Sequence, residues 1–144
     1  MVQACSHKIL RGLENAPEAA EIRKAVFIEE QGFENEFDET DSYAYHCVVF
    51  IDNVPAACGR VFSDDKGDFH IGRIAVMKQF RGRGLGRRTV ELLEDKIREL
   101  GGKTAVLSAQ TRVKGFYMSM GYVPFGEEYQ DEFCPHIAMK KQIL

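Results

Sequence analysis

The sequence lacks several features that would assign it to a membrane, metal-binding or disulfide-bonded class. It has no tryptophan, only four prolines, and no apolar run near the roughly 18 residues of a transmembrane helix. Residues Met1–Leu13 include His7, Lys8 and Arg11 and lack the apolar core of a signal peptide. The four cysteines are irregularly spaced and form no C-x-x-C pair, which argues against a zinc site or a disulfide framework. We therefore expect reduced thiols, no metal, no membrane partner and a cytoplasmic location.

Charge of either sign is not in large excess. The formal net charge is −3 over 144 residues, of which 44% are hydrophobic and 28% charged. A chain with this balance has no global field that attracts nucleic acid, so we expect no nucleic-acid partner. The length suits a single domain over residues 1–144 that buries a core without disulfides or metals.

The first half of the chain predicts a strand, a helix and an antiparallel meander. Residues 1–10 are the expected first strand, and Asn15-Ala16-Pro17 begins the helix, because asparagine is a good cap and proline is tolerated in the first turn. The apolar stripe of this helix consists of Ala19, Ile22 and Val26. We expect the helix to end near Gln31-Gly32, before an acidic loop over 33–43. Three β-prone runs then alternate with turns: 46–51, 54–62 and 69–76.

The second half predicts helices and strands joined by a parallel crossover. Residues 87–100 have helical spacing of apolar residues, and Gly101-Gly102 ends that helix. The apolar face consists of Val90, Leu93, Ile97 and Leu100. Further elements follow: a buried strand at 103–109, a short helix at 111–120 and a last strand at 135–141. A strand, glycine-rich turn, helix and strand in this order form a right-handed parallel unit, so the expected fold class is α+β with a mixed sheet.

The most informative segment is Arg81-Gly82-Arg83-Gly84-Leu85-Gly86-Arg87, which lies between a strand and a helix. Its three glycines let backbone N–H groups converge on one point without an interfering Cβ. The N-terminus of the following helix adds unpaired amides and the positive end of its dipole. Positive charge comes from Arg81, Arg83, Arg87 and Arg88. Together these features predict a cradle for an anion the size of a pyrophosphate.

Three other interpretations fit this segment less well. A Walker P-loop requires Gly-Lys-Ser/Thr after its spacer, and no such tripeptide follows these glycines in the segment. A Rossmann turn requires G-x-G-x-x-G, whereas Gly86 comes one residue early and a meander leads into the turn. The third interpretation, a glycine-rich turn with solvated arginines and no ligand, is not excluded. It is disfavoured because arginines crowded at a helix N-terminus oppose the helix dipole unless an anion is present.

The run Arg81–Gly86 resembles the R/Q-x-x-G-x-G/A signature of the GNAT superfamily of acyl-CoA N-acyltransferases, whose loop holds the pyrophosphate of coenzyme A. A second element, Gly115–Tyr122, is similar to a family helix that ends in aromatic-Tyr-x-x-x-Gly-aromatic. Looser motifs resemble the ElaA-like subgroup: Val26–Gln31, the acidic pattern Glu36-x-Asp38-x-x-Asp41, and Pro135-His136-Ile137. The resemblance covers nearly the whole chain.

The resemblance implies a central twisted, mostly antiparallel sheet, flanked by helices, with a parallel splay between strands 69–76 and 103–109. It implies an N-acetyltransferase that takes acetyl-CoA as co-substrate and transfers the acetyl group to a primary amine of a small molecule or peptide, by direct attack in a ternary complex. The strand before the glycine loop would pair with the pantetheine arm of the coenzyme, and a backbone N–H there would stabilise the oxyanion. The implied coenzyme-binding residues are Ile74, Ala75, Val76, Arg81, Gly82, Arg83, Gly84, Leu85, Gly86, Arg87, Gln110 and Phe116.

The resemblance also implies two catalytic roles. Tyr117 stands where relatives place an acid that protonates the departing thiolate, and a phenol with a pKa of roughly 10 suits a thiol of similar order. His70 falls at the spacing of a glutamate that many relatives use as the base, so this chain departs from the family pattern there; histidine titrates near neutrality and suits the role. Rivals for the base are His136, Glu30 and Asp38. The alternatives are that Tyr117 only packs against the pantetheine arm and that His70 is a structural residue.

An isolated arginine and an acidic segment complete the candidates. Arg73 interrupts an apolar strand, so we expect it to pair with an acidic residue of 29–41 rather than to face a ligand. That segment is either a solvated loop or a lip that attracts a cationic amine, such as a polyamine, an amino sugar or a peptide N-terminus. Its acidic residues are Glu29, Glu30, Glu34, Glu36, Asp38, Glu39 and Asp41.

Two functions other than an enzyme also stay open. One is a non-catalytic acyl-CoA-binding sensor, which would release no thiol in the presence of amines. The other is a nucleotide- or nucleic-acid-binding module, which predicts salt-sensitive binding and is disfavoured by the acidic balance of the chain. Exposed strand edges are compatible with a monomer or a homodimer.

Overall fold

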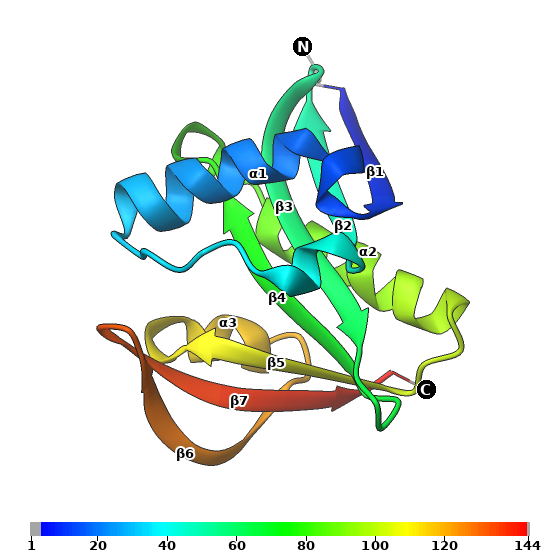
Figure 1. The fold of residues 1–144 in the computed structure, drawn as a ribbon, viewed down its shortest axis with the longest axis vertical. Coiled ribbons are helices and arrows are strands. Elements are labelled where there is room, and N and C mark those ends of the chain that lie inside the picture. Colours follow the sequence, from blue (N-terminus) through cyan, green and yellow to red (C-terminus); the bar gives the residue numbers. More distant parts are fainter. Residues whose placement is uncertain (1–3, 144) are drawn as a thin grey trace.

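The protein is built around one seven-stranded sheet, which a computed structural model describes over residues 4–143 (Figure 1). The strands follow the order β1-β2-β3-β4-β5-β7-β6. Neighbouring strands are antiparallel except for the parallel pair β4 and β5. The strands are β1 (Cys5–Arg11), β2 (Tyr45–Ile51), β3 (Val54–Ser63), β4 (Phe69–Val76), β5 (Thr104–Gln110), β6 (Val123–Asp131) and β7 (Cys134–Gln142). The predicted α+β fold with one parallel pair is confirmed.

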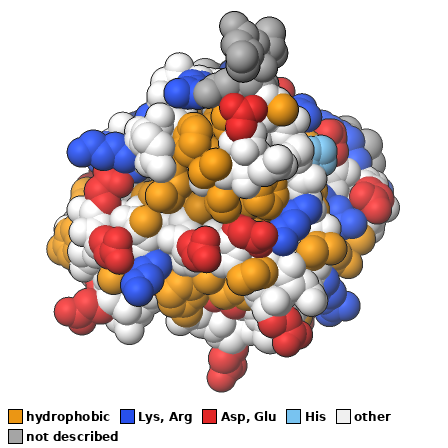
Figure 2. Space-filling model, turned by 90° about the horizontal axis from the view of Figure 1, so that it is seen from above, with side chains coloured by type: hydrophobic (Ala, Val, Ile, Leu, Met, Phe, Trp, Pro, Cys, Tyr) orange, Lys and Arg blue, Asp and Glu red, His pale blue; other side chains and the backbone are white. Residues whose placement is uncertain are grey.

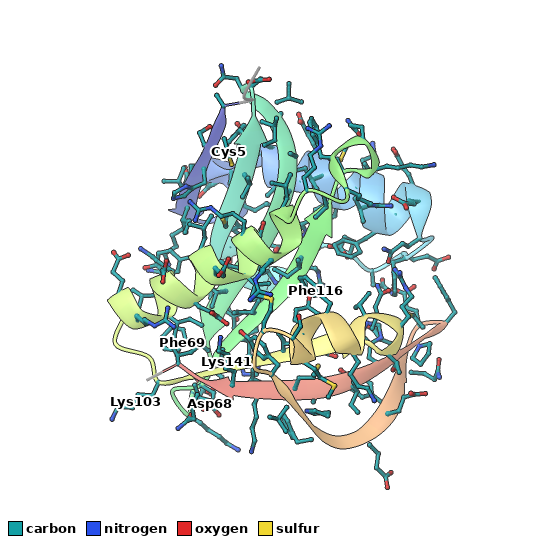
Figure 3. All side chains as sticks on the ribbon, turned by 180° about the vertical axis from the view of Figure 1, so that it is seen from behind. Cys5, Asp68, Phe69, Lys103, Phe116 and Lys141 are labelled. Atoms are coloured by element: carbon teal, nitrogen blue, oxygen red, sulfur yellow. The ribbon has the colours of Figure 1, made fainter. Side chains whose placement is uncertain are left out.

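Helices cover both faces of this sheet. On one face lies α1 (Pro17–Arg23), which continues as a π-helical segment over Lys24–Glu30. On the other face lie α2 (Leu85–Glu99) and the short α3 (Lys114–Met118), as Figures 1 and 3 show from opposite sides. Short 3-10 helices lie at Leu13–Asn15, Glu39–Ser42, Lys78–Phe80 and Thr111–Val113. Among residues 4–143, no helix is long and apolar enough to cross a bilayer.

Alternating side chains of the central strands fill a core on each side of the sheet. In β2, Cys47 and Val49 belong to the cluster that includes α2, whereas Val48 between them belongs to the cluster under α1. The fully buried residues of α2 include Val90, Leu93 and Ile97, and those of α1 and its extension include Ala19, Ile22 and Val26. Both predicted helical stripes are therefore confirmed as core faces.

Three details differ from the prediction. Asn15 does not cap α1, because its Nδ2 donates to the carbonyl of Arg11 at 2.7 Å and Ala16 stands at the cap position. Leu100 lies just beyond the last turn of α2 and is 40% exposed. The strand β6 was not expected, because nearly all of its residues are exposed and its sequence lacks apolar alternation. Residues 1–3 of the predicted first strand lie outside the described residues.

The parallel strands β4 and β5 separate soon after they pair. Only Phe69–Ile71 of β4 pairs with Ala105–Leu107 of β5. Beyond this point the end of β4 pairs only with β3, and the end of β5 pairs with β7. Arg73 has a φ of 54°, and the pairing of β3 with β4 is irregular beside it. The predicted splay between these two strands is therefore present.

A glycine in β3 permits α2 to pack closely on the sheet. A Cβ at Gly59 would lie 2.5 Å from Cδ1 of Ile74 and 2.8 Å from Cδ1 of Leu93. Carbon atoms do not approach each other this closely without displacement. A side chain at Gly59 would have to displace these methyl groups, so the glycine suits the close packing of α2 against β3 and β4.

Candidate active site

Two clefts open at the splay of β4 and β5. The larger has a volume of about 510 Å³ and lies beside the glycine-rich loop; we call it the glycine cleft. The smaller has a volume of about 180 Å³ and lies between the ends of β4, β5 and β7; we call it the splay pocket. Residues that line both are Gln31, Ile74, Arg112, Val113 and Tyr117. The two clefts therefore meet where β4 leaves β5.

The glycine-rich loop places unpaired amides at the wall of the glycine cleft. Gly82 and Gly84 have φ values of 79° and 75°, and Gly84 is the residue before the first turn of α2. The amide of Arg88 makes a hydrogen bond to the Gly84 carbonyl at 3.0 Å, so the amides of residues 85–87 precede the first bond of the helix. No side chain of residues 4–143 caps this N-terminus, and the first turn of α2 has no acidic residue. A Cβ at Gly82 or Gly84 would meet no atom within 4 Å. An open, positively polarised helix end of this kind fits a pyrophosphate.

The arginines of the loop have different partners. Arg81 forms two hydrogen bonds of 2.6 Å to the carboxylate of Glu30, and its Nε donates to the Val76 carbonyl at 3.0 Å. These hydrogen bonds lower the pKa of Glu30 and raise that of Arg81. The guanidinium of Arg83 lies 5.4 Å above the ring of Phe80. Arg81 therefore joins the end of the π-helical segment to β4 and does not act as an unpaired cation in the cradle.

Most of the predicted coenzyme-binding residues line the glycine cleft. They are Ile74, Ala75, Val76, Arg81, Gly82, Gly84, Leu85, Gly86, Arg87 and Phe116. Phe116, labelled on α3 in Figure 3, approaches the loop closely, since its Cζ lies 3.4 Å from the position of a Cβ at Gly86. Arg83 and Gln110 are not among the lining residues of this cleft. The backbone of β4 and the glycine loop thus form two adjoining walls of one cavity.

Gln110 lines the splay pocket instead. Its Nε2 donates to Oε1 of Gln31 at 2.8 Å, and its Oε1 accepts a hydrogen bond from Nε of Arg112 at 2.9 Å. The amide is therefore part of a bridge between the end of β5 and the segment after α1. Neither Gln31 nor Arg112 was predicted from the sequence to be a site residue, because nothing in their spacing shows that they meet.

Tyr117 lies at the junction of the two clefts. It is 8% exposed, and its ring packs edge-on against Phe116 and Tyr122 with centroid distances of 4.9 and 6.0 Å. Its hydroxyl makes no hydrogen bond to any described residue. Burial raises the pKa of Tyr117 to about 12, so the phenol keeps its proton at neutral pH.

The four candidate bases lie in different places. His70 is at the paired end of β4, where its Nε2 lies 2.7 Å from Asp64 and its ring stacks on Phe62 at 5.1 Å. It lines neither cleft, because the strands separate only after this residue. His136 lines the splay pocket, with Nδ1 2.9 Å from the Cys134 carbonyl. Glu30 lines the glycine cleft and is bound to Arg81, and Asp38 is bound to arginines as described next.

The acidic segment is anchored by three buried or half-buried arginines. Arg73 lies 3.0 Å from Glu36 and 3.4 Å from Asp38, as predicted for a residue that needs an acidic partner. Two further arginines were not predicted to take part: Arg23 binds Glu36 and Asp41 at 2.8 and 2.7 Å, and Arg60 binds Asp38 and Asp41 at 2.7 and 2.8 Å. We call these six residues the arginine–carboxylate network. The formal charges of the network cancel. Glu36, Asp38 and Asp41 therefore add no net negative charge that would attract a cationic amine to the acidic segment.

The turn between β6 and β7 contacts the segment after α1 at the splay pocket, through hydrogen bonds and a pair of stacked rings. The carboxylate of Glu132 accepts hydrogen bonds from the amides of Glu34 and Asn35 at 3.1 and 3.2 Å. The rings of Phe33 and Phe133 stack with centroids 5.0 Å apart. Glu132, Asn35 and Phe33 all line the pocket.

On the face shown in Figure 2, acidic and basic side chains are interspersed, without a broad basic surface.

Comparison with known proteins agrees with this geometry. Residues 14–143 match the family described as acetyltransferase (GNAT) domain. A Bacillus subtilis protein that bears the name of an acetyltransferase is 39% identical over 132 residues, or 86% of this chain and 87% of that protein. The crystal structure of Escherichia coli ElaA superposes with a TM-score of 0.84 at 25% identity, covering 96% of this chain and 99% of that one. An acetyltransferase-type structure from Lactobacillus plantarum gives 0.90 at 26% identity, covering 98% and 99%. The chain therefore belongs to the GNAT family of acyl-CoA-dependent N-acyltransferases and, within it, is similar to ElaA.

Proposed function

We propose that this protein is an N-acetyltransferase that transfers the acetyl group of acetyl-CoA to a primary amine of a small molecule or peptide, by direct attack in a ternary complex. One observation carries the proposal: the glycine cleft and the splay pocket meet at Tyr117. A donor in the first cleft and an acceptor in the second would bring their reacting ends together at this residue. Membership in the family supports an acyl-CoA as the donor.

The walls of the glycine cleft support coenzyme A as the carrier of the acetyl group. The helix N-terminus with open glycines suits the pyrophosphate, and the edge of β4 that has left β5 suits the amide groups of the pantetheine arm. The free cysteines of the described chain support a cytoplasmic location.

Tyr117 is the proposed acid. Its phenol is protonated at neutral pH, its hydroxyl has no partner among residues 4–143, and it lines both clefts. In this role it gives its proton to the sulfur of coenzyme A as the C–S bond breaks. His70 stays a predicted base by spacing, but its distance from both clefts and its pairing with Asp64 favour a structural role.

Thermal unfolding with acetyl-CoA, free CoA, ATP and NAD at equal concentrations tests the donor. A ligand at about 100 times its Kd stabilises the protein by about 2.7 kcal/mol, which raises the unfolding temperature by several degrees. We expect this rise with acetyl-CoA and CoA only. No rise with either, or a rise with ATP or NAD alone, would overturn the assignment of the glycine cleft.

Thiol release in the presence of spermidine, glucosamine or trialanine tests the transfer. Tyr117→Phe should keep the acetyl-CoA shift and lower kcat by about 10²-fold or more. Tyr43→Phe, at a 45% exposed tyrosine that lines neither cleft, is the matched control and should change neither value. Normal turnover by Tyr117→Phe would exclude the acid role. Binding of acetyl-CoA without thiol release for any of the amines would instead favour a non-catalytic acyl-CoA sensor.

A further inference from the structure

We propose that Glu36 binds the acceptor amine in the splay pocket and takes its proton as the amide bond forms. The inference rests on the proposed function and assigns the base to a residue that sequence spacing did not select. Glu36 lines the same pocket as Tyr117 and is 5% exposed. It therefore presents a buried carboxylate to the space in which an acceptor would lie.

The contacts of Glu36 leave one of its oxygens available. Oε2 accepts from Nε of Arg23 at 2.8 Å and lies 3.0 Å from Nε of Arg73. The backbone carbonyl of Glu36 accepts hydrogen bonds from the same two arginines, at 2.9 and 3.0 Å. Oε1 makes no hydrogen bond to any residue between 4 and 143 and is not among the fully enclosed polar atoms without a partner. The side chain is thus fixed from one side and has its second oxygen open to the pocket.

The neighbouring carboxylates do not share this property. Both oxygens of Asp41 and both oxygens of Asp38 accept hydrogen bonds within the arginine–carboxylate network. Both oxygens of Glu132 accept hydrogen bonds from backbone amides, one from Glu34 and one from Asn35. Asp131 also lines the pocket but is exposed, so its carboxylate stays hydrated. Glu36 is therefore the buried carboxylate of the described pocket that has an uncommitted oxygen.

The surrounding charges make Glu36 suitable as a proton acceptor. The titratable groups that face it or its pocket are Arg23 of α1, Arg60 of β3, Arg73 of β4, Arg112 and Tyr117 of the segment after β5, Asp131 of β6, Glu132 of the turn before β7, His136 of β7, and Asp38 and Asp41 of its own segment. Burial raises the pKa of Glu36 and outweighs the opposing effect of the arginines. A carboxyl group with a raised pKa holds an incoming proton more firmly than an ordinary carboxylate.

The proposed step balances in electrons and protons. The lone pair of a neutral primary amine forms the C–N bond with the thioester carbonyl carbon, and the C–S bond breaks with its electron pair on sulfur. The nitrogen becomes acidic as the bond forms and gives one proton to Oε1 of Glu36, while sulfur receives one proton from Tyr117. Water then carries one proton from Glu36 to Tyr117, which returns both residues to their starting states.

Glu36→Gln tests the inference, because glutamine keeps the size and the oxygen that the arginines bind but cannot take the proton. Thiol release is measured with acetyl-CoA and spermidine, glucosamine or trialanine, and the acetyl-CoA shift of the unfolding temperature is measured in parallel. We expect kcat to fall by about 10²- to 10⁴-fold with an unchanged shift. Glu94→Gln is the matched control, since it makes the same change at a buried carboxylate that is bound by Tyr122 and Lys141 and lines neither cleft; its kcat should stay within about tenfold of wild type.

The pH dependence of kcat separates catalysis from positioning. In the wild type, kcat should fall at acidic pH as Glu36 becomes protonated. In Asp38→Asn this acidic limb should move to lower pH, because the loss of a neighbouring anion favours the ionised form of Glu36; this readout holds even if Glu36→Gln does not fold. The role of Glu36 would be overturned by a folded Glu36→Gln with wild-type kcat, by equal losses of kcat in Glu36→Gln and Glu94→Gln, or by an acidic limb that does not move in Asp38→Asn. These outcomes would leave the proposed transfer itself standing. No thiol release by the wild type with any of the three amines would overturn the proposed transfer itself.

Discussion

Replacing Arg23 by methionine should destabilise the fold far more than the same change at Arg98. The two guanidiniums lie at the same distance, 2.8 Å, from a carboxylate oxygen: Arg23 from Glu36 and Arg98 from Asp95. The side chains of the first pair are 1% and 6% exposed, and those of the second are 41% and 71% exposed. Breaking a buried pair costs about 3–5 kcal/mol because water does not replace the lost partner of the remaining carboxylates, whereas an exposed pair is worth about 0.2–1 kcal/mol.

Urea unfolding followed by far-ultraviolet circular dichroism measures the loss of unfolding free energy in both variants, and it suits this tryptophan-free chain. For a protein of this length, each 1 kcal/mol corresponds to about 2–4 °C in the unfolding temperature. We therefore expect Arg23→Met to lower that temperature by about 6–20 °C, and Arg98→Met by less than about 4 °C. Equal losses in the two variants, or a loss below about 1 kcal/mol for Arg23→Met, would refute the argument that burial sets the cost.

Three other perturbations test the loop, the core and the network. Gly84→Glu should abolish the acetyl-CoA shift, whereas Gly67→Glu, at a glycine with a similar φ (85° against 75°) and equally open space, should retain it; a shift retained by Gly84→Glu would contradict the anion cradle. Gly59→Ala should lower the free energy of unfolding in urea by about 1–3 kcal/mol, because its Cβ overlaps Ile74 and Leu93; an unchanged midpoint would show that α2 shifts freely. Burial opposes the ionisation of Asp41, but hydrogen bonds from Arg23 and Arg60 outweigh it and lower its pKa from 3.8 to about 2. This lowered pKa means that Asp41 contributes about 2 kcal/mol of stability above its unfolded pKa and loses it as pH falls from 3.8 towards 2. Urea unfolding at stepped pH should show the wild type losing more stability on acidification than Asp41→Asn, and parallel losses would contradict the assignment.

Local patterns in the sequence predicted the elements whose burial is regular. The apolar stripe of α2 and the glycines before it define the helix and the loop, because both depend on residues within one turn of each other. The strand β6 was not predicted, because it lies at the edge of the sheet and is exposed along nearly all its length. An edge strand that buries neither face has no alternation to detect.

The candidate site was predictable only where one segment forms it. Arg73 was predicted to need an acidic partner, since a charge in an apolar strand is costly alone, and the pairing is confirmed. Its actual partners could not be chosen from spacing, because Arg23 and Arg60 compete for the same carboxylates from distant segments. The place where β4 leaves β5 is likewise a property of the sheet, and it leaves His70 on the paired side.

The π-helical turn after α1 has a consequence for comparing this chain with its relatives. In Lys24–Glu30 the amide of Gln31 reaches back to the carbonyl of Val26, five residues earlier, at 3.1 Å. Such a turn holds one residue more than an α-helical turn. The wider turn takes up that extra residue, so the residues on either side of it keep the directions they would have in an uninterrupted helix. A relative with one residue fewer in this segment can therefore form an ordinary α-helix there and still direct the counterparts of Glu30 and Gln31 towards the clefts that these residues line here. A one-residue gap at this place in an alignment would mark the loss of the π-helical turn, and not the loss of the Arg81–Glu30 and Gln31–Gln110 bonds.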